Sequence, residues 1–212
     1  VLESVDFKTN NCAALNTIEN FAFGTTPSLT SLDFSKCTAL VNFGDNVQPF
    51  VPTATGVNTE LESIILPTAI TNIGIAMKNL RVLSTLKAGD GTSLEKTAIT
   101  KIINDAFTND KALTSLSLPA TVETIDDTPF EGCTALTSLA IDGTHLTVLG
   151  TPETPLFGAT DVLEFLTISN NTAVDIKKGV LTSQSGLANV SIAAGKNFTG
   201  TIGSDDVAIR IA

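Results

Sequence analysis

Residues 113–136 read LTSLSLPATVETIDDTPFEGCTAL, and this stretch decides the fold. It opens with Leu113, Leu116 and Leu118, an apolar frame of the form Leu-x-x-Leu-x-Leu. Alternate side chains of an extended segment face opposite sides, so the second and third residues of the frame point together into a core. A second short apolar turn follows, and then Phe130. The stretch predicts one short strand and one turn of a coil, closed at the back by a phenylalanine.

The same frame recurs along the whole chain, with Val, Ile, Phe or Ala in place of some leucines. The spacings between successive first residues are 27, 32, 22, 30, 23, 27 and 24. A period of this size is typical of architectures in which each repeat packs only on its neighbours. We therefore expect residues 1–212 to form a single domain of about eight repeats. The frames are Leu2/Val5/Phe7, Leu29/Leu32/Phe34, Leu61/Ile64/Leu66, Leu83/Leu86/Ala88, Leu113/Leu116/Leu118, Leu136/Leu139/Ile141, Leu163/Leu166/Ile168 and Leu187/Val190/Ile192.

The composition is that of an acidic protein with enough apolar residues for an elongated core. Of the 212 residues 42% are hydrophobic, the net charge is −10, and all the aromatic residues are phenylalanine. An acidic surface repels phosphate backbones, which argues against nucleic acid as a partner. A run of about 18 apolar residues is absent, so we expect no membrane span. The first frame starts at Leu2, from which we expect that a signal segment has been removed.

The three cysteines, Cys12, Cys37 and Cys133, are too few for a disulfide scaffold. Cys12 and Cys37 lie in adjacent repeats, so a bridge between them is conceivable. The favoured expectation is that all three are free, buried thiols that act as small hydrophobic groups.

The pattern over residues 111–139 resembles the BspA-like, or treponemal-type, leucine-rich repeat, L-x-x-I-x-L-P-x-x-V-x-x-I-G-x-x-A-F-x-x-C-x-x-L. Residues 60–74 and 99–116 match parts of it, and Cys133 holds the position of its cysteine. The resemblance implies an α/β repeat solenoid, a right-handed superhelix. Short parallel strands would form its concave face, and irregular turns or short helices its convex side. It further implies a secreted or surface-attached microbial protein that binds host or neighbouring-cell proteins.

A search for reactive groups gives no catalytic constellation. The sole histidine, His145, follows a turn-like Asp-Gly-Thr, and the pairs Asp126-Asp127 and Asp205-Asp206 are neighbours whose side chains diverge on an extended chain. Nucleophile, phosphate-binding and zinc-ligand motifs are absent from the sequence. We predict no enzyme, no cofactor and no metal site, and a hydrolase built on Asp and His145 is the least favoured alternative.

The residues between the anchors should line the exposed face of the strands. They are mostly Ser and Thr and lack the Trp, Tyr and Arg that usually anchor tight interfaces. Phe165 and Ile65 stand out there, and Lys87 lies in the same row as Ile65. Insertions in repeat proteins form loops that often serve contact. The turn-rich segment 44–59, which contains Pro49 and Phe50, is therefore a second candidate contact.

Two functions remain open. The first is a non-enzymatic protein-binding module of the cell surface or extracellular space, with adhesion as one form of that role. Its partner would be a host or neighbouring-cell surface protein or a matrix protein. The second is a structural spacer, or stalk, within a longer secreted or surface protein, suggested by the small side chains of the strand face. The sequence gives no prediction of oligomeric state.

Overall fold

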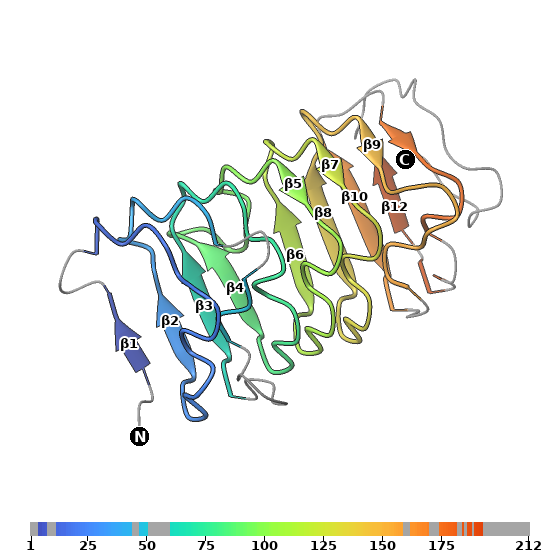
Figure 1. Cartoon of the computed structure of the whole chain (residues 1–212). Coiled ribbons are helices and arrows are strands. Elements are labelled where there is room, and N and C mark those ends of the chain that lie inside the picture. Colours follow the sequence, from blue (N-terminus) through green and yellow to red (C-terminus); the bar gives the residue numbers. More distant parts are fainter. Residues whose placement is uncertain are drawn as a thin grey trace.

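The computed structural model describes residues 4–7, 12–43, 47–50, 60–158, 162–169, 174–181, 184, 186, 187 and 189–192. In this part the chain winds into stacked coils, one for each repeat, and all its regular elements are short strands. Figure 1 shows the strands in layers along the length of the molecule, with neighbouring coils side by side.

The long strands arise from the Leu-x-x-Leu-x-Leu frames, one strand for each frame. They pair in parallel, and equivalent frame positions lie opposite each other, as Leu116 does to Leu139. They form two four-stranded sheets in the orders β1-β2-β3-β4 and β6-β8-β10-β12. The prediction of short parallel strands is thus confirmed. The long strands are β1 (Ser4–Asp6), β2 (Ser31–Asp33), β3 (Ser63–Leu66), β4 (Thr85–Ala88), β6 (Ser115–Leu118), β8 (Ser138–Asp142), β10 (Phe165–Ser169) and β12 (Asn189–Ile192).

A third sheet of two-residue strands lies on another side of the coils. It contains β5 (Lys101–Ile102), β7 (Thr124–Ile125), β9 (Val148–Leu149) and β11 (Asp175–Ile176), again parallel. Each forms at the second apolar turn of its repeat, because the apolar residue there points inward while its neighbour faces out.

The core is a continuous column of anchors closed by phenylalanines. Leu116 is 1% exposed and Phe130 is fully buried. The ring of Phe130 stacks between Phe107 and Phe157, with centroid distances of 5.6 Å and 5.4 Å. The predicted phenylalanine plug is therefore present in the coil of Phe130, and its ring touches those of the two adjacent coils.

The expectation of an α/β fold with short helices is wrong, because the described residues contain no helix. In the turns behind the strands, backbone amides donate to the next coil instead of to a residue four positions back. The amide of Phe107 bonds the carbonyl of Pro129, and that of Asn109 bonds the carbonyl of Glu131. Asn109 also has a φ of 66°, which is incompatible with a right-handed helix. Stacking between coils thus replaces helical hydrogen bonds.

The expectation that all cysteines are free is also wrong. Cys12 and Cys37 form a disulfide with a Cα–Cα distance of 4.6 Å, whereas Cys133 is free and buried. Adjacent coils stack at about the 4.8 Å strand spacing, so residues of the two turns come within disulfide range. The sequence does not reveal that the two cysteines lie at equivalent places in their coils. Cys12 follows the first leucine of its repeat by ten residues, whereas Cys37 follows its own by eight.

A seven-residue insertion separates the two long-strand sheets. In the fifth repeat Leu118 and Val122 are four positions apart, but the corresponding Ala88 and Ile99 are eleven apart. The additional residues are 89–95. No pairing joins β4 to β6 in the described structure, and Figure 1 shows the wider separation between these two strands.

Candidate protein-binding face

The candidate site is the long-strand face, defined here as the outward-facing residues of β1–β4, β6, β8, β10 and β12. On β3 and β4, Ile65 and Lys87 are register partners and both are half-buried. Asp33 on β2 is the other partner of Ile65. An apolar side chain thus lies between an acid and a base on this half of the face.

Phe165 lies on the other half, on β10, opposite Ser138 of β8. It is 45% exposed, as much as any large hydrophobic side chain among the described residues. Its described neighbour in the row, Ser138, has a small polar side chain, so the ring projects beyond it. The structure therefore puts the three predicted strand-face residues on one face but on two separate sheets.

Pro49 and Phe50 do not line this surface. Both are buried, and the Phe50 ring packs against Phe23 and Phe43 at centroid distances of 5.8 Å. This packing removes them from the candidate contact surface and makes them part of the core. Of the predicted contact segment 44–59 only residues 47–50 are described, and the remainder lies outside the described residues.

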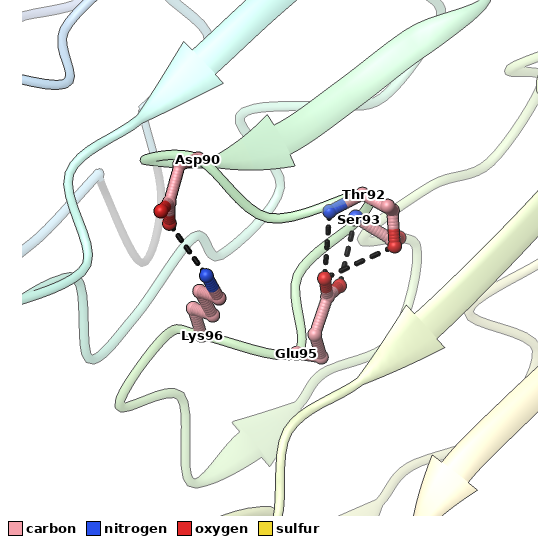
Figure 2. A network of polar contacts seen from close by, with 5 residues as sticks. All are labelled: Asp90, Thr92, Ser93, Glu95 and Lys96. Carbon is pink, nitrogen blue, oxygen red and sulfur yellow. Dashed lines mark hydrogen bonds and ion pairs between the residues drawn. The ribbon is translucent and has the colours of Figure 1, made fainter.

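The insertion has a defined conformation around Glu95, as Figure 2 shows. Its carboxylate accepts hydrogen bonds from the backbone amides of Thr92, at 2.6 Å, and Ser93, at 2.7 Å. Burial acts to raise the pKa of Glu95, but these hydrogen bonds and one from the Thr92 hydroxyl outweigh it, so the pKa is lowered. At the start of the insertion Asp90 pairs with Lys96 at 2.5 Å. The carboxylate thus folds residues 92–95 into a tight turn.

A hollow of about 550 Å³ is lined by Ser35, Lys36, Gly89 and Asp90. It lies between the turn that follows β2 and the first residues of the insertion. No residue of this hollow was predicted as a site from the sequence. The hollow is open and its charged side chains, Lys36 and Asp90, are exposed. It is therefore a surface depression and not an enclosed pocket.

Two buried side chains, Asp110 and Cys133, each bond the coil before their own. Asp110, three residues before Leu113, accepts the Leu80 amide at 2.8 Å. Cys133, three residues before its own frame, donates from Sγ to the Phe107 carbonyl. Burial raises the pKa of both Asp110 and Cys133. These groups hold coils together and lie away from the long-strand face.

His145 also has a structural contact. Its exposed ring donates from Nδ1 to the Ala120 carbonyl of the preceding coil at 2.6 Å. In the described part of the chain it forms no ion pair with an acid. Within the same residues no group of three or more His, Cys, Asp or Glu side chains could hold a metal ion. None of the described residues belongs to a helix that could cross a membrane.

Comparison with protein families gives a match to the BspA type leucine rich repeat region. Six copies of that repeat match within residues 53–148 and 100–204, which together span more than half of the chain. This chain belongs to the BspA-type leucine-rich repeat family. The resemblance seen in residues 111–139 is thereby confirmed.

Two solved structures are similar to this BspA-type chain. One is a leucine-rich repeat protein from Bacteroides ovatus, with 19% identity and a TM-score of 0.42 over 84% of this chain and 59% of that one. The other is a leucine rich cell surface protein from Faecalibacterium prausnitzii, with 15% identity and a TM-score of 0.30 over 90% of this chain and 72% of that one. The present chain thus spans little more than half of the first protein. No curated protein sequence matches it.

Proposed function

We propose that this BspA-type chain is a non-enzymatic module that binds proteins at a cell surface or in the extracellular space, with adhesion to host or neighbouring cells as its role. The observation that carries the proposal is the long-strand face, a repeat surface on which Phe165 projects 45% exposed among small polar side chains. Stacked repeats of this kind form extended contact surfaces.

The Cys12–Cys37 disulfide supports the location outside the cell. Disulfides persist in oxidising compartments and are rare in the cytosol. The F. prausnitzii protein described above as a cell surface protein is consistent with the same location.

Binding to immobilised matrix proteins, to mammalian cells and to bacterial cells tests this function. We expect saturable binding to at least one of these, weakened at least tenfold by Phe165→Ser together with Ile65→Ser. The matched control is Val41→Ser, which removes a 45% exposed apolar side chain next to the Asn42–Asn72 bridge, away from the long strands. Absence of saturable binding to all three by the folded protein would overturn the proposal.

A stalk within a longer surface protein is the second candidate. The small side chains of the long-strand face favour it, because strong binding sites usually contain large aromatic or arginine anchors. Deleting this domain from the full-length protein separates the two roles. A stalk predicts that binding of the remaining protein persists, whereas a binding module predicts that it is lost.

A further inference from the structure

The two long-strand sheets are separated by a break in the hydrogen-bond ladder between the first halves of β4 and β6, which we call the notch. At four other junctions a carbonyl just before one strand accepts two amides from the next coil. Between β4 and β6 this pair of bonds is missing: in the described structure nothing donates to the Ser84 carbonyl, and the amides of Thr114 and Ser115 have no partner. The four complete junctions centre on the carbonyls of Thr30, Glu62, Thr114 and Thr137.

The second half of the same space is filled by the insertion. The Ser93 carbonyl accepts the amide of Ala88 on β4, at 2.9 Å, and the Leu94 amide donates to Ser117 on β6, at 3.0 Å. The Ser93 hydroxyl accepts the Ser117 amide as well, at 2.9 Å. Two residues thus occupy the place of an inserted strand, which puts β4 and β6 about 10 Å apart there, twice the usual strand spacing.

Strand alternation identifies the groups that face the notch. In a parallel ladder both backbone groups of a residue point to one neighbour, and those of the next residue point to the other. Because the Thr85 amide donates to the Glu62 carbonyl, just before β3, the amide and carbonyl of Leu86 face the notch. Those of Ser115 face it from β6 by the same rule, because Ser117 faces the insertion. These groups could bond a strand lying between them.

The notch opens to solvent but not into the core. Ser84, Thr85, Thr114 and Ser115 are exposed. Beneath them the frame leucines remain closed, with Leu86 3% exposed, for example. An occupant would therefore bind through its backbone and needs no apolar side chain to fill a pocket.

The surroundings of the notch are basic in an otherwise acidic protein. Six of the 12 Lys and Arg residues, but only four of the 22 acids, lie within residues 78–111. Arg81 and Lys111 are exposed at equivalent positions, in the turns that lead into β4 and β6. Neither makes an ion pair in the described structure, nor does Lys87 on β4. Glu62 is the exposed acid at the start of the adjacent β3.

We propose that this notch accepts an extended acidic segment of a partner protein, which adds as a short strand between β4 and β6. Backbone groups facing the notch supply the ladder, and Arg81 and Lys111 attract the acidic side chains. Peptide addition to exposed strand edges is a recurring mode of recognition. The inference rests on the proposed protein-binding function and assigns it a partner class.

A blocked eight-residue peptide of alternating glutamate and threonine tests the proposal with the full chain, by nuclear magnetic resonance titration. We expect saturable shifts of the Leu86 and Ser115 amide signals. Arg81→Glu with Lys111→Glu should weaken binding at least tenfold, whereas Lys36→Glu, an exposed cation in the turn after β2, should leave it unchanged. Methylation of alternate peptide amides, and replacement of its glutamates by lysine, should each abolish binding.

Deletion of residues 89–95 gives a second, structural test. The deletion gives the fourth repeat the same spacing as the fifth. β4 and β6 can then pair and close the notch, so the folded variant should not bind the peptide. Undiminished binding by that folded variant would overturn the proposal, as would binding that tolerates amide methylation or failure of the peptide to bind the folded wild-type chain. If the deletion prevents folding, the charge and methylation experiments decide.

The same variants separate this inference from the proposed function. If the wild-type chain binds cells or matrix proteins but not the acidic peptide, the notch proposal alone is refuted. If it binds none of them, both are refuted.

Discussion

The backbone amide of Leu80 donates to Oδ1 of Asp110, 2.8 Å away in the next coil. This bond crosses the stack at a fully buried position, while Oδ2 of the same carboxyl has no partner among the described residues. Burial raises the pKa of Asp110 well above its ordinary value of 3.8. The chain thus places an ionisable group where one of its oxygens has a structural role and the other opposes stability.

Asp110→Asn should stabilise the protein at neutral pH. The asparagine keeps an oxygen for the Leu80 amide and removes the ionisable carboxyl, whose charged form is disfavoured by burial. Because the folded pKa is raised, the stability that Asp110 contributes is fully present below pH 3.8 and is lost as pH rises toward the folded pKa. The gain in Tm should therefore be larger at pH 7 than at pH 4. An equal change at both pH values would contradict the assignment.

Phe130→Ala should destabilise the fold by about 3–5 kcal/mol, because it opens a cavity between Phe107 and Phe157 in the stacked column. Phe165→Ala is the matched control, since its ring is 45% exposed. That variant should stay within about 0.5 kcal/mol of the wild type. Urea unfolding of the three proteins measures both values, and similar losses in the two variants would be inconsistent with the core described here.

Leu116→Asp should disrupt the coil that contains β6. It places a charge at a position that is 1% exposed, at a cost of several kcal/mol. Ser115→Asp introduces the same group one residue earlier, on the exposed side of the strand, and should fold normally. Circular dichroism melting compares them. A near-native Tm for Leu116→Asp would mean that the frame has been placed on the wrong side of the strand.

These variants also mark how far the sequence could predict the structure. The inward position of Leu116 follows from frame spacing alone, because a two-residue alternation repeated along the chain leaves one consistent register. The absence of helices did not follow, because an amide that bonds the next coil leaves no local sequence signal.

The remaining features depend on which coil positions become neighbours. Asp110 and Cys133 occupy equivalent positions, at which the side chain bonds the preceding coil. The equivalence can be seen in the sequence once the structure is known, because Ala106-Phe107-x-x-Asp110 has the spacing of Pro129-Phe130-x-x-Cys133. An acidic side chain is typical of the surface, so the sequence alone does not predict that Asp110 is buried. The spacing of 30 residues after Leu83 is one of the two longest, but it does not locate the insertion, whose entry between two strands depends on contacts of Ser93 with other coils.

The Cys12–Cys37 disulfide should stabilise the first coils. Closing a loop with a sequence separation of 25 residues contributes about 3 kcal/mol through the unfolded state. Cys12→Ser, Cys37→Ser and the double variant should therefore lose the same amount, since each breaks one bond. Thiol titration of the denatured protein, produced under oxidising conditions, should detect one free thiol before reduction and three after it. Three thiols before reduction would refute the bridge.

Glu95 should titrate below its ordinary value of 4.5, since the amides of Thr92 and Ser93 stabilise its charged form. A lowered folded pKa contributes stability that is present above pH 4.5 and is lost as pH falls through the folded pKa. Glu95→Gln weakens both hydrogen bonds, so at pH 7 the amides of Thr92 and Ser93 should exchange with solvent faster than in the wild type. At a pH below the folded pKa this difference should disappear. Glu123→Gln, which removes an exposed acid from the next repeat, should leave both amides unchanged. Equal exchange in the wild type and Glu95→Gln at pH 7 would show that another contact holds the insertion between β4 and β6.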